Sequence, residues 1–157
     1  EGIKGAQAVA SAVYLARHNY DKNEIKEFIE KEFEYDLSFT LDQIRDIYCF
    51  DETCQGTVPF ALVAFLESKN FEDAIRLAIS IGGDSDTIAC ITGSIAGGFY
   101  HEIPREIVDF VYLLIPNEFK VMIREFDECF YTKHNEDRTL SLSEFKNILE
   151  EENELNH

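Results

Sequence analysis

The stretch SIGGDSDTIACITGSIAGGFYH, residues 80–101, decides how this chain is interpreted. Two glycines precede Asp84, Ser85, Asp86 and Thr87, and a long run of apolar and small residues follows. That run indicates a helix packed closely by its neighbours, because small side chains let helices approach one another. Two carboxylates two residues apart repel each other, and burying them is costly unless a cation lies between them. The stretch therefore indicates either a metal site or the capped start of a helix.

The metal interpretation depends on the oxygen atoms of Asp84, Asp86 and Thr87. Hard divalent cations such as Mg²⁺ take carboxylate, hydroxyl and water oxygens as ligands. A bound cation would remove the repulsion between the two aspartates and make their burial tolerable. The alternative is N-capping, because Asp and Ser at a helix start stabilise it without any metal. The run that follows predicts a central helix, which would place the aspartates deep in the domain.

Length and composition limit the classes of protein that this chain can represent. Its 157 residues suffice for one domain with a single core, and 45% of them are hydrophobic. A formal net charge of −17 argues against binding a nucleic-acid backbone or an anionic membrane. The longest strongly apolar stretch, residues 88–100, is too short to span a bilayer. The four cysteines form no CxxC pair, which favours reduced thiols in a cytoplasmic protein over a disulfide framework or a zinc site.

Apolar residues recur at helical rather than alternating spacing along the chain, so the fold is expected to be all-α, a compact multi-helix bundle. Asp21 and Glu24 form a capping-box start for one helix, Asn70 caps another, and Pro59 and Pro104 fit first helical turns. Helices are expected over residues 5–17, 22–33, 41–47, 59–68, 71–81, from about 84–87 onward, 104–115, 118–131 and 143–152.

The string GGDSDTIACITGSIAGGFY, residues 82–100, resembles the carboxy-terminal signature of the ADP-ribosylglycohydrolases. The segments EGIKGAQAVASAVYLAR (1–17), CQGTVPFALVAFLES (54–68) and FEDAIRLAIS (71–80) also resemble that family. The resemblance covers residues 1–115 and leaves 116–157 as a helical extension. It implies an all-α enzyme with a two-metal centre of Mg²⁺, or of Mn²⁺, in a central cleft. It also implies hydrolysis of the glycosidic bond between ADP-ribose and a protein side chain or small acceptor.

The same resemblance implies roles for nine residues. Asp84, Asp86 and Thr87 would be metal ligands, and the metals would orient the ribose and position the attacking water. Six further residues would contact the substrate, two at the ribose or phosphates and four near the adenosine half: Gly83, Ser85, Glu52, Thr53, Cys54 and Gln55. No catalytic residue is assigned with certainty in this half of the family's sequence.

Family members carry an upstream Thr-Asp-Asp-Thr motif that supplies the remaining metal ligands, and this sequence contains no Thr-Asp-Asp. It also begins at Glu1 without an initiator methionine. Two carboxylates and one hydroxyl cannot fill two octahedral Mg²⁺ shells without many waters. We therefore expect either half of a complete enzyme, inactive without its upstream half, or an inactive module that binds ADP-ribose or a partner. An oligomer or an upstream half-domain would cover the apolar faces left exposed.

Two other features have simpler interpretations. Residues 133–145 faintly resemble a calcium-binding EF-hand loop, but Lys133 and Arg138 stand where a carboxylate and a glycine are needed. A degenerate calcium-binding protein is therefore a third, weaker alternative. Tyr35, Tyr48 and Phe50 could stack on adenine, although aromatic residues at helix junctions usually belong to the core.

Overall fold

The computed structural model describes residues 1–130, and every regular element in that range is an α-helix. This confirms the all-α class. Two compact units are separated at Pro104, namely Glu1–Pro104 and Arg105–His157, and each is described by itself. The division at residue 115 stays a prediction. The EF-hand-like residues 133–145 and the expected helix over 143–152 lie outside the described residues.

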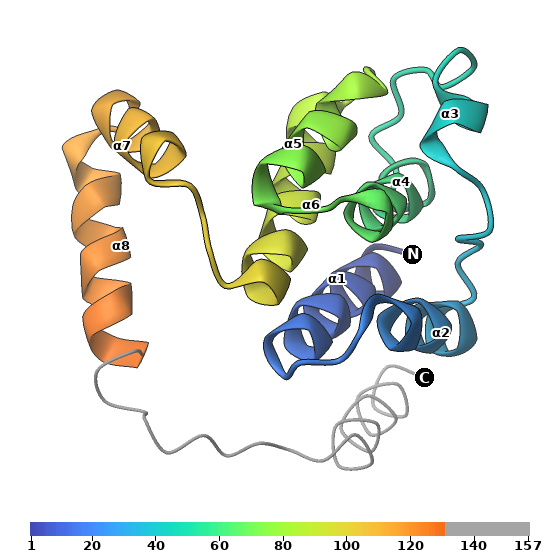
Figure 1. Ribbon diagram of the computed structural model, residues 1–157, viewed down its shortest axis with the longest axis horizontal. Helices are drawn as coiled ribbons and strands as arrows, with labels where there is room; N and C mark the ends of the chain where they lie inside the picture. Colours follow the sequence, from blue (N-terminus) through green and yellow to red (C-terminus); the bar gives the residue numbers. More distant parts are fainter. Residues whose placement is uncertain (131–157) are drawn as a thin grey trace. The chain divides into compact units, whose positions relative to one another are not determined.

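The first unit contains six helices (Figure 1). They are α1 (Gly2–Arg17), α2 (Lys22–Phe33), α3 (Leu41–Ile44), α4 (Cys54–Glu67), α5 (Phe71–Ser80) and α6 (Ser85–Tyr100). The capping box of Asp21 and Glu24 starts α2, and the Asn70 side chain caps α5, as the sequence indicated. α3 is shorter than expected and gives way to a turn at residues 45–47.

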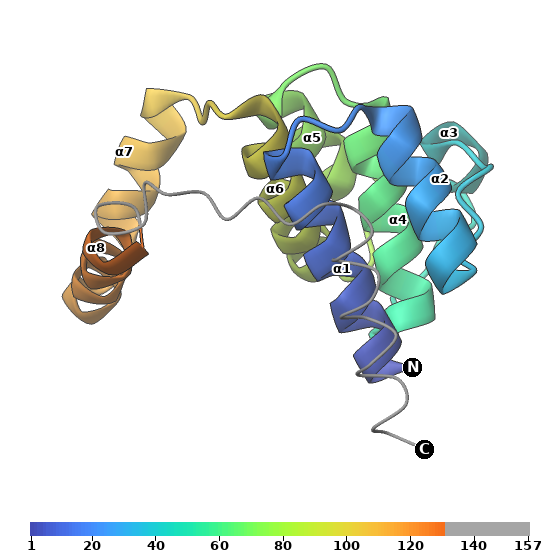
Figure 2. The same ribbon diagram turned by 90° about the horizontal axis from the view of Figure 1, so that it is seen from below.

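The small-residue helix α6 is central, because it packs against α1, α4 and α5, and Figure 2 shows α1, α4 and α6 running side by side. Gly98 lies against α1, and Gly93 lies against Ile75 of α5. The buried Thr92 hydroxyl donates to the Ala61 carbonyl of α4 at 3.0 Å. The prediction of a central helix in close contact with several neighbours is therefore confirmed.

The start of α4 differs from the expectation. We predicted a helix from Pro59, but α4 begins five residues earlier at Cys54, and Pro59 lies inside it. The Thr53 hydroxyl caps the helix by accepting the Gly56 N–H at 3.1 Å. Residues 56–59 are all buried, and the apolar surface they remove from water offsets the helical hydrogen bond that proline cannot donate.

Lys22 joins three helices at the other end of this unit. Its ammonium donates to the carbonyls of Phe65 at 2.9 Å and Leu66 at 3.1 Å, and also to that of Ser68, all at the end of α4. It further donates to the Tyr100 hydroxyl of α6 at 3.0 Å. A cation suits this position because the last carbonyls of a helix carry partial negative charge.

The second unit contains α7 (Arg105–Leu114) and α8 (Asn117–Phe130), and α7 has no buried residue. Many large apolar side chains of these two helices are exposed: Phe110, Val111, Tyr112, Leu113, Leu114, Phe119, Val121, Met122, Ile123 and Phe126. Among residues 1–130, none of the helices combines the length and hydrophobicity that crossing a membrane requires.

Candidate functional site

Two segments meet where α6 begins: the turn over residues 82–84, which leads into α6, and residues 48–53, which lead into the first turn of α4. The Tyr48 ring lies directly against Gly83, where a Cβ atom would overlap it. The Tyr48 hydroxyl donates to the Gly56 carbonyl at 2.8 Å. Burial raises the pKa of Tyr48, and the nearby carboxylates of Asp51 and Asp84 raise it further. Tyr48 therefore connects the aspartate turn to the start of α4.

Gly83 is required in this turn for two reasons. Its φ of +63° lies in the left-handed region, which is costly for residues with a Cβ atom. In addition, the Tyr48 ring occupies the space that a side chain would need. Gly82 shares the left-handed conformation, with φ +73°, but no atom lies within 4 Å of the position that a Cβ atom would take there. The glycine pair thus lets the chain turn sharply between α5 and the aspartates.

The predicted metal ligands lie together but not deep in the domain. Asp84 is half-buried at the N-cap position of α6, where its side chain makes no capping hydrogen bond, while Asp86 and Thr87 are exposed. A hydrogen bond with the Asp84 side chain, together with the backbone N–H groups of Thr87 and Asp86, lowers the pKa of Asp86. The expectation of buried aspartates was wrong, because the buried face of α6 begins at Ile88.

The predicted substrate residues around 52–55 are only partly a loop. Glu52 and Thr53 are exposed before the helix, whereas Cys54 and Gln55 form the first turn of α4. Cys54 is half-buried, with its thiol close against Gly5 of α1. The sequence placed all four in one loop because it put the start of the helix at the proline. Ser85 is half-buried as the first residue of α6.

A groove of about 440 Å³ adjoins this junction and involves α3, the 47–51 segment and α4. Its walls are mostly apolar, although the polar side chains of Asp51 and Gln55 also contribute. The residues that line it are Ile44, Ile47, Tyr48, Cys49, Phe50, Asp51, Gln55, Gly56 and Phe60. The Tyr48 and Phe60 rings lie with centroids 4.6 Å apart. Phe50 is 66% exposed, so its assignment to the core was wrong, whereas Tyr35, 6% exposed, is a core residue.

Asp51 was missed in the sequence and is part of the same junction. Its carboxylate accepts the Thr53 N–H at 2.8 Å and lies against Gly56, leaving no room for a side chain there. Hydrogen bonds from the Thr53 backbone and hydroxyl lower the pKa of Asp51. No signal in the sequence indicated this contact, because with the helix expected from Pro59 nothing placed Gly56 in a first helical turn beside another side chain.

The donor set fits a hard cation in chemical type. Asp84 and Asp86 provide carboxylate oxygens and Thr87 a hydroxyl, the ligand types that Mg²⁺ takes together with water. Within residues 1–130, no cluster of three or more His, Cys, Asp or Glu residues is suited to hold a metal ion. These three residues would therefore hold one face of a cation, and water or further ligands would complete its coordination.

The fold and the candidate site together define an all-α protein with oxygen donors at the start of its central helix. The family model for ADP-ribosylglycohydrolase matches residues 1–134. The chain therefore belongs to the ADP-ribosylglycohydrolase family, which confirms the resemblance seen in the sequence. Among the solved structures, none gives a significant match.

Two relatives of this chain, from different bacteria, bear the same name. The chain is 32% identical over 111 residues to the ADP-ribosylarginine hydrolase Tri1 of Pseudomonas putida, covering 64% of this chain and 28% of that protein. It is 42% identical over 55 residues to the Tri1 of Serratia proteamaculans, covering 34% of this chain and 15% of that protein. The chain thus spans less than a third of the length of either relative.

Proposed function

We propose that this chain contributes the carboxy-terminal part of an ADP-ribosylglycohydrolase site, which hydrolyses the bond between ADP-ribose and a protein side chain or small conjugate. Family membership supports the reaction class. The observation that carries the proposal is the junction itself, where Tyr48 holds the turn bearing Asp84 against the groove. Because two relatives are named ADP-ribosylarginine hydrolases, arginine is the first linkage to test.

The roles proposed for this chain's residues follow from their places. Asp84, Asp86 and Thr87 would hold a magnesium ion, which when bound would orient the ribose and lower the pKa of a water molecule. Gly83 and Ser85 would lie along the ribose or phosphates, because backbone N–H groups at a helix start favour anions. The groove lined by Gln55 and the exposed Phe50 would take the adenosine half. The residues lying near that half would be Glu52, Thr53, Cys54 and Gln55.

The runner-up is a module that binds ADP-ribose without hydrolysing it. Three oxygen-bearing side chains are too few for two magnesium ions, so catalysis would need ligands from outside residues 1–130. Binding of the sugar and base has no such requirement, because the groove and the turn are both part of this chain. A cytoplasmic location fits both proposals, because the four cysteines are free thiols, as expected in a reducing compartment.

The test offers ADP-ribosylated arginine to the 157-residue chain with Mg²⁺, with Mn²⁺ and with EDTA. Free ADP-ribose is quantified by chromatography, and binding of ADP-ribose is measured by calorimetry. Release that needs the metal supports the hydrolase. Binding without release is expected of the module, and also of a hydrolase site whose remaining metal ligands come from outside residues 1–130. If ADP-ribose is neither released nor bound, both proposals are contradicted.

The metal assignment is tested with Asp84→Asn and Asp86→Asn, each of which removes one anionic oxygen and keeps the size of the side chain. Both should weaken Mn²⁺ binding, followed by electron paramagnetic resonance, by about tenfold or more. Asp46→Asn is the matched control, because Asp46 is an exposed aspartate in the turn after α3. Equal loss in all three variants would show that general surface charge, not this turn, binds the ion.

A further inference from the structure

The segment that carries Tyr48 has little apolar burial of its own to hold it in place. On either side of the half-buried Tyr48, Ile47 is 73% exposed and Phe50 is 66% exposed. Cys49 is exposed as well. Apolar contacts therefore retain this segment mainly through one ring, and polar contacts must supply the remaining restraint.

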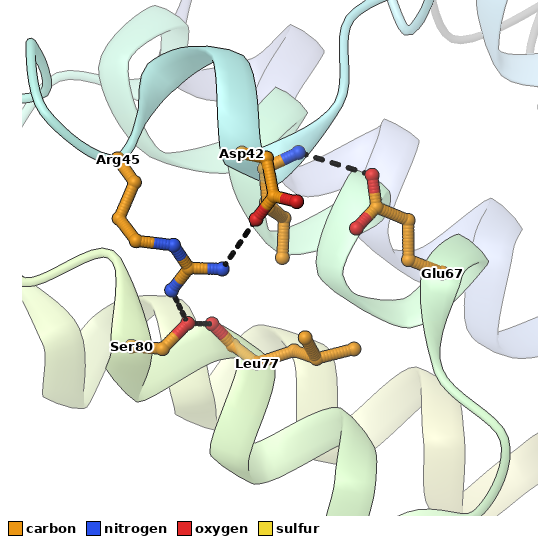
Figure 3. Close-up of polar contacts among 6 residues, drawn as sticks. Asp42, Arg45, Glu67, Leu77 and Ser80 are labelled. Atoms are coloured by element: carbon orange, nitrogen blue, oxygen red, sulfur yellow. Dashed lines mark hydrogen bonds and ion pairs between the residues drawn. The ribbon is translucent and has the colours of Figure 1, made fainter.

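Arg45 supplies such a restraint, as Figure 3 shows. Its guanidinium donates through Nη1 to the hydroxyl of Ser80 and through Nη2 to the Asp42 carboxylate at 3.1 Å. The Ser80 hydroxyl in turn donates to the Leu77 carbonyl at 2.7 Å, so it is held in place to accept from Arg45. Ser80 is the last residue of α5, two positions before the glycine pair.

Arg45 lies at the end of the short helix α3, and a second contact anchors the start of that helix (Figure 3). The Leu41 N–H, at the start of α3, donates to the Glu67 carboxylate at the end of α4, at 3.0 Å. α3 is thus attached to α4 by Glu67 and to α5 by Arg45. Tyr48 follows three residues after Arg45, and its N–H donates to the Ile44 carbonyl at 2.8 Å.

We infer that Arg45 is a positioning residue for the candidate site: it fixes the Tyr48 segment to the end of α5 and so sets the turn that carries Asp84. Arg45 contacts the element on one side of Gly82–Gly83, and Tyr48 contacts Gly83 itself. Without Arg45, the Tyr48 ring would have the Gly56 carbonyl and Phe60 as its remaining anchors. The consequence for ligand binding rests on the function proposed above.

The planar guanidinium suits this role because it donates in two directions at once. Lysine carries a single ammonium group on a side chain of different reach, so Arg45→Lys should keep only part of the restraint on the Tyr48 segment. Asp42 is 91% exposed on its side chain, which makes the ion pair with Arg45 weak on its own. Asp42 lies in α3 itself, so the link from Arg45 to α5 is the contact with Ser80.

Hydrogen exchange on the 157-residue chain, read by mass spectrometry, tests the inference without any ligand. In Arg45→Ala and in Ser80→Ala, the amides of residues 82–88 should exchange about tenfold faster, because local opening of the turn becomes easier. Arg45→Lys should give an intermediate rate. Amides of α1 serve as the internal reference and should not change, since a general loss of stability would raise exchange there too.

The matched control is Arg76→Ala, because Arg76 is an exposed arginine of α5 whose ion pair with Glu72 lies within the same helix. Its exchange pattern at residues 82–88 should equal that of the parent chain. Unchanged exchange in Arg45→Ala, or an equal rise in Arg76→Ala and in α1, would overturn the inference.

Calorimetric titration with ADP-ribose separates this inference from the proposed function. If the parent chain binds ADP-ribose, Arg45→Ala should bind it several-fold more weakly, and equal affinity would overturn the positioning role. If the parent chain does not bind ADP-ribose while the exchange result holds, the proposed function fails and the structural role of Arg45 stands.

Discussion

Substituting alanine for Gly83 should destabilise the chain through two separable effects. The first is the left-handed φ of +63°, which costs a residue with a Cβ atom about 1 kcal/mol. The second is overlap of the new methyl group with the Tyr48 ring, because overpacking a contact of this kind costs about 1–3 kcal/mol. Gly83→Ala should therefore lower the free energy of unfolding by about 2–4 kcal/mol.

Gly82→Ala is the matched control, because Gly82 has φ +73° and no atom within 4 Å of the added methyl group. It should show the backbone cost alone, about 1 kcal/mol. Urea unfolding followed by far-ultraviolet circular dichroism measures both variants against the parent chain. The difference between them isolates the steric contribution of Tyr48.

A double-mutant cycle completes the test. In a Tyr48→Ala background, the ring is absent, so Gly83→Ala should cost no more than Gly82→Ala. The cycle then gives a coupling of about 1–3 kcal/mol between positions 48 and 83. If Gly82→Ala and Gly83→Ala cost the same in the parent chain, the close packing of Tyr48 on the turn is refuted.

Three further outcomes are expected, all measured as free energies of unfolding in urea. Lys22→Met leaves the last carbonyls of α4 without their cation and should cost about 3 kcal/mol, whereas Lys26→Met, which breaks a half-buried ion pair with Glu30, should cost about 0.5 kcal/mol; equal losses would contradict the role of Lys22. Thr92→Val removes the buried hydrogen bond between α6 and the Ala61 carbonyl of α4 and should cost about 1 kcal/mol, and no loss would show that this hydrogen bond contributes nothing. Hydrogen bonds from Thr53 lower the pKa of Asp51, so its stabilising effect should be present above the usual carboxyl pKa and disappear as the pH falls below that range through the lowered pKa of Asp51. Asp51→Asn should remove this part of the acid sensitivity, and an unchanged pH profile would contradict it.

Helix positions were largely predictable because their signals are local. The capping box at Asp21 and the cap at Asn70 identify their helices through hydrogen bonds within one turn. The start of α4 was not predictable in this way, because Pro59 fits a first turn equally well. Burial of residues 56–59 against the rest of the unit decided that the helix begins earlier.

The site shows the same division. Asp84, Asp86 and Thr87 are neighbours in sequence, so the pattern alone predicted that their oxygens lie together at the start of a helix. Their exposure was not predictable, because it depends on which face of α6 the other helices cover. Tyr48 was not identified as part of this junction because it meets Gly83, which is distant in the sequence, only after folding, and Asp51 was not identified because the helix start beside it was placed at Pro59.

The sequence by itself determined the all-α class, the small-residue central helix and the family, since each depends on residue types at short spacing. Only the tertiary structure decided that Tyr48 packs on Gly83 and that Arg45 reaches Ser80, 35 residues away. Contacts of this kind depend on how whole helices pack, because their free energy comes from surfaces that no single segment contains.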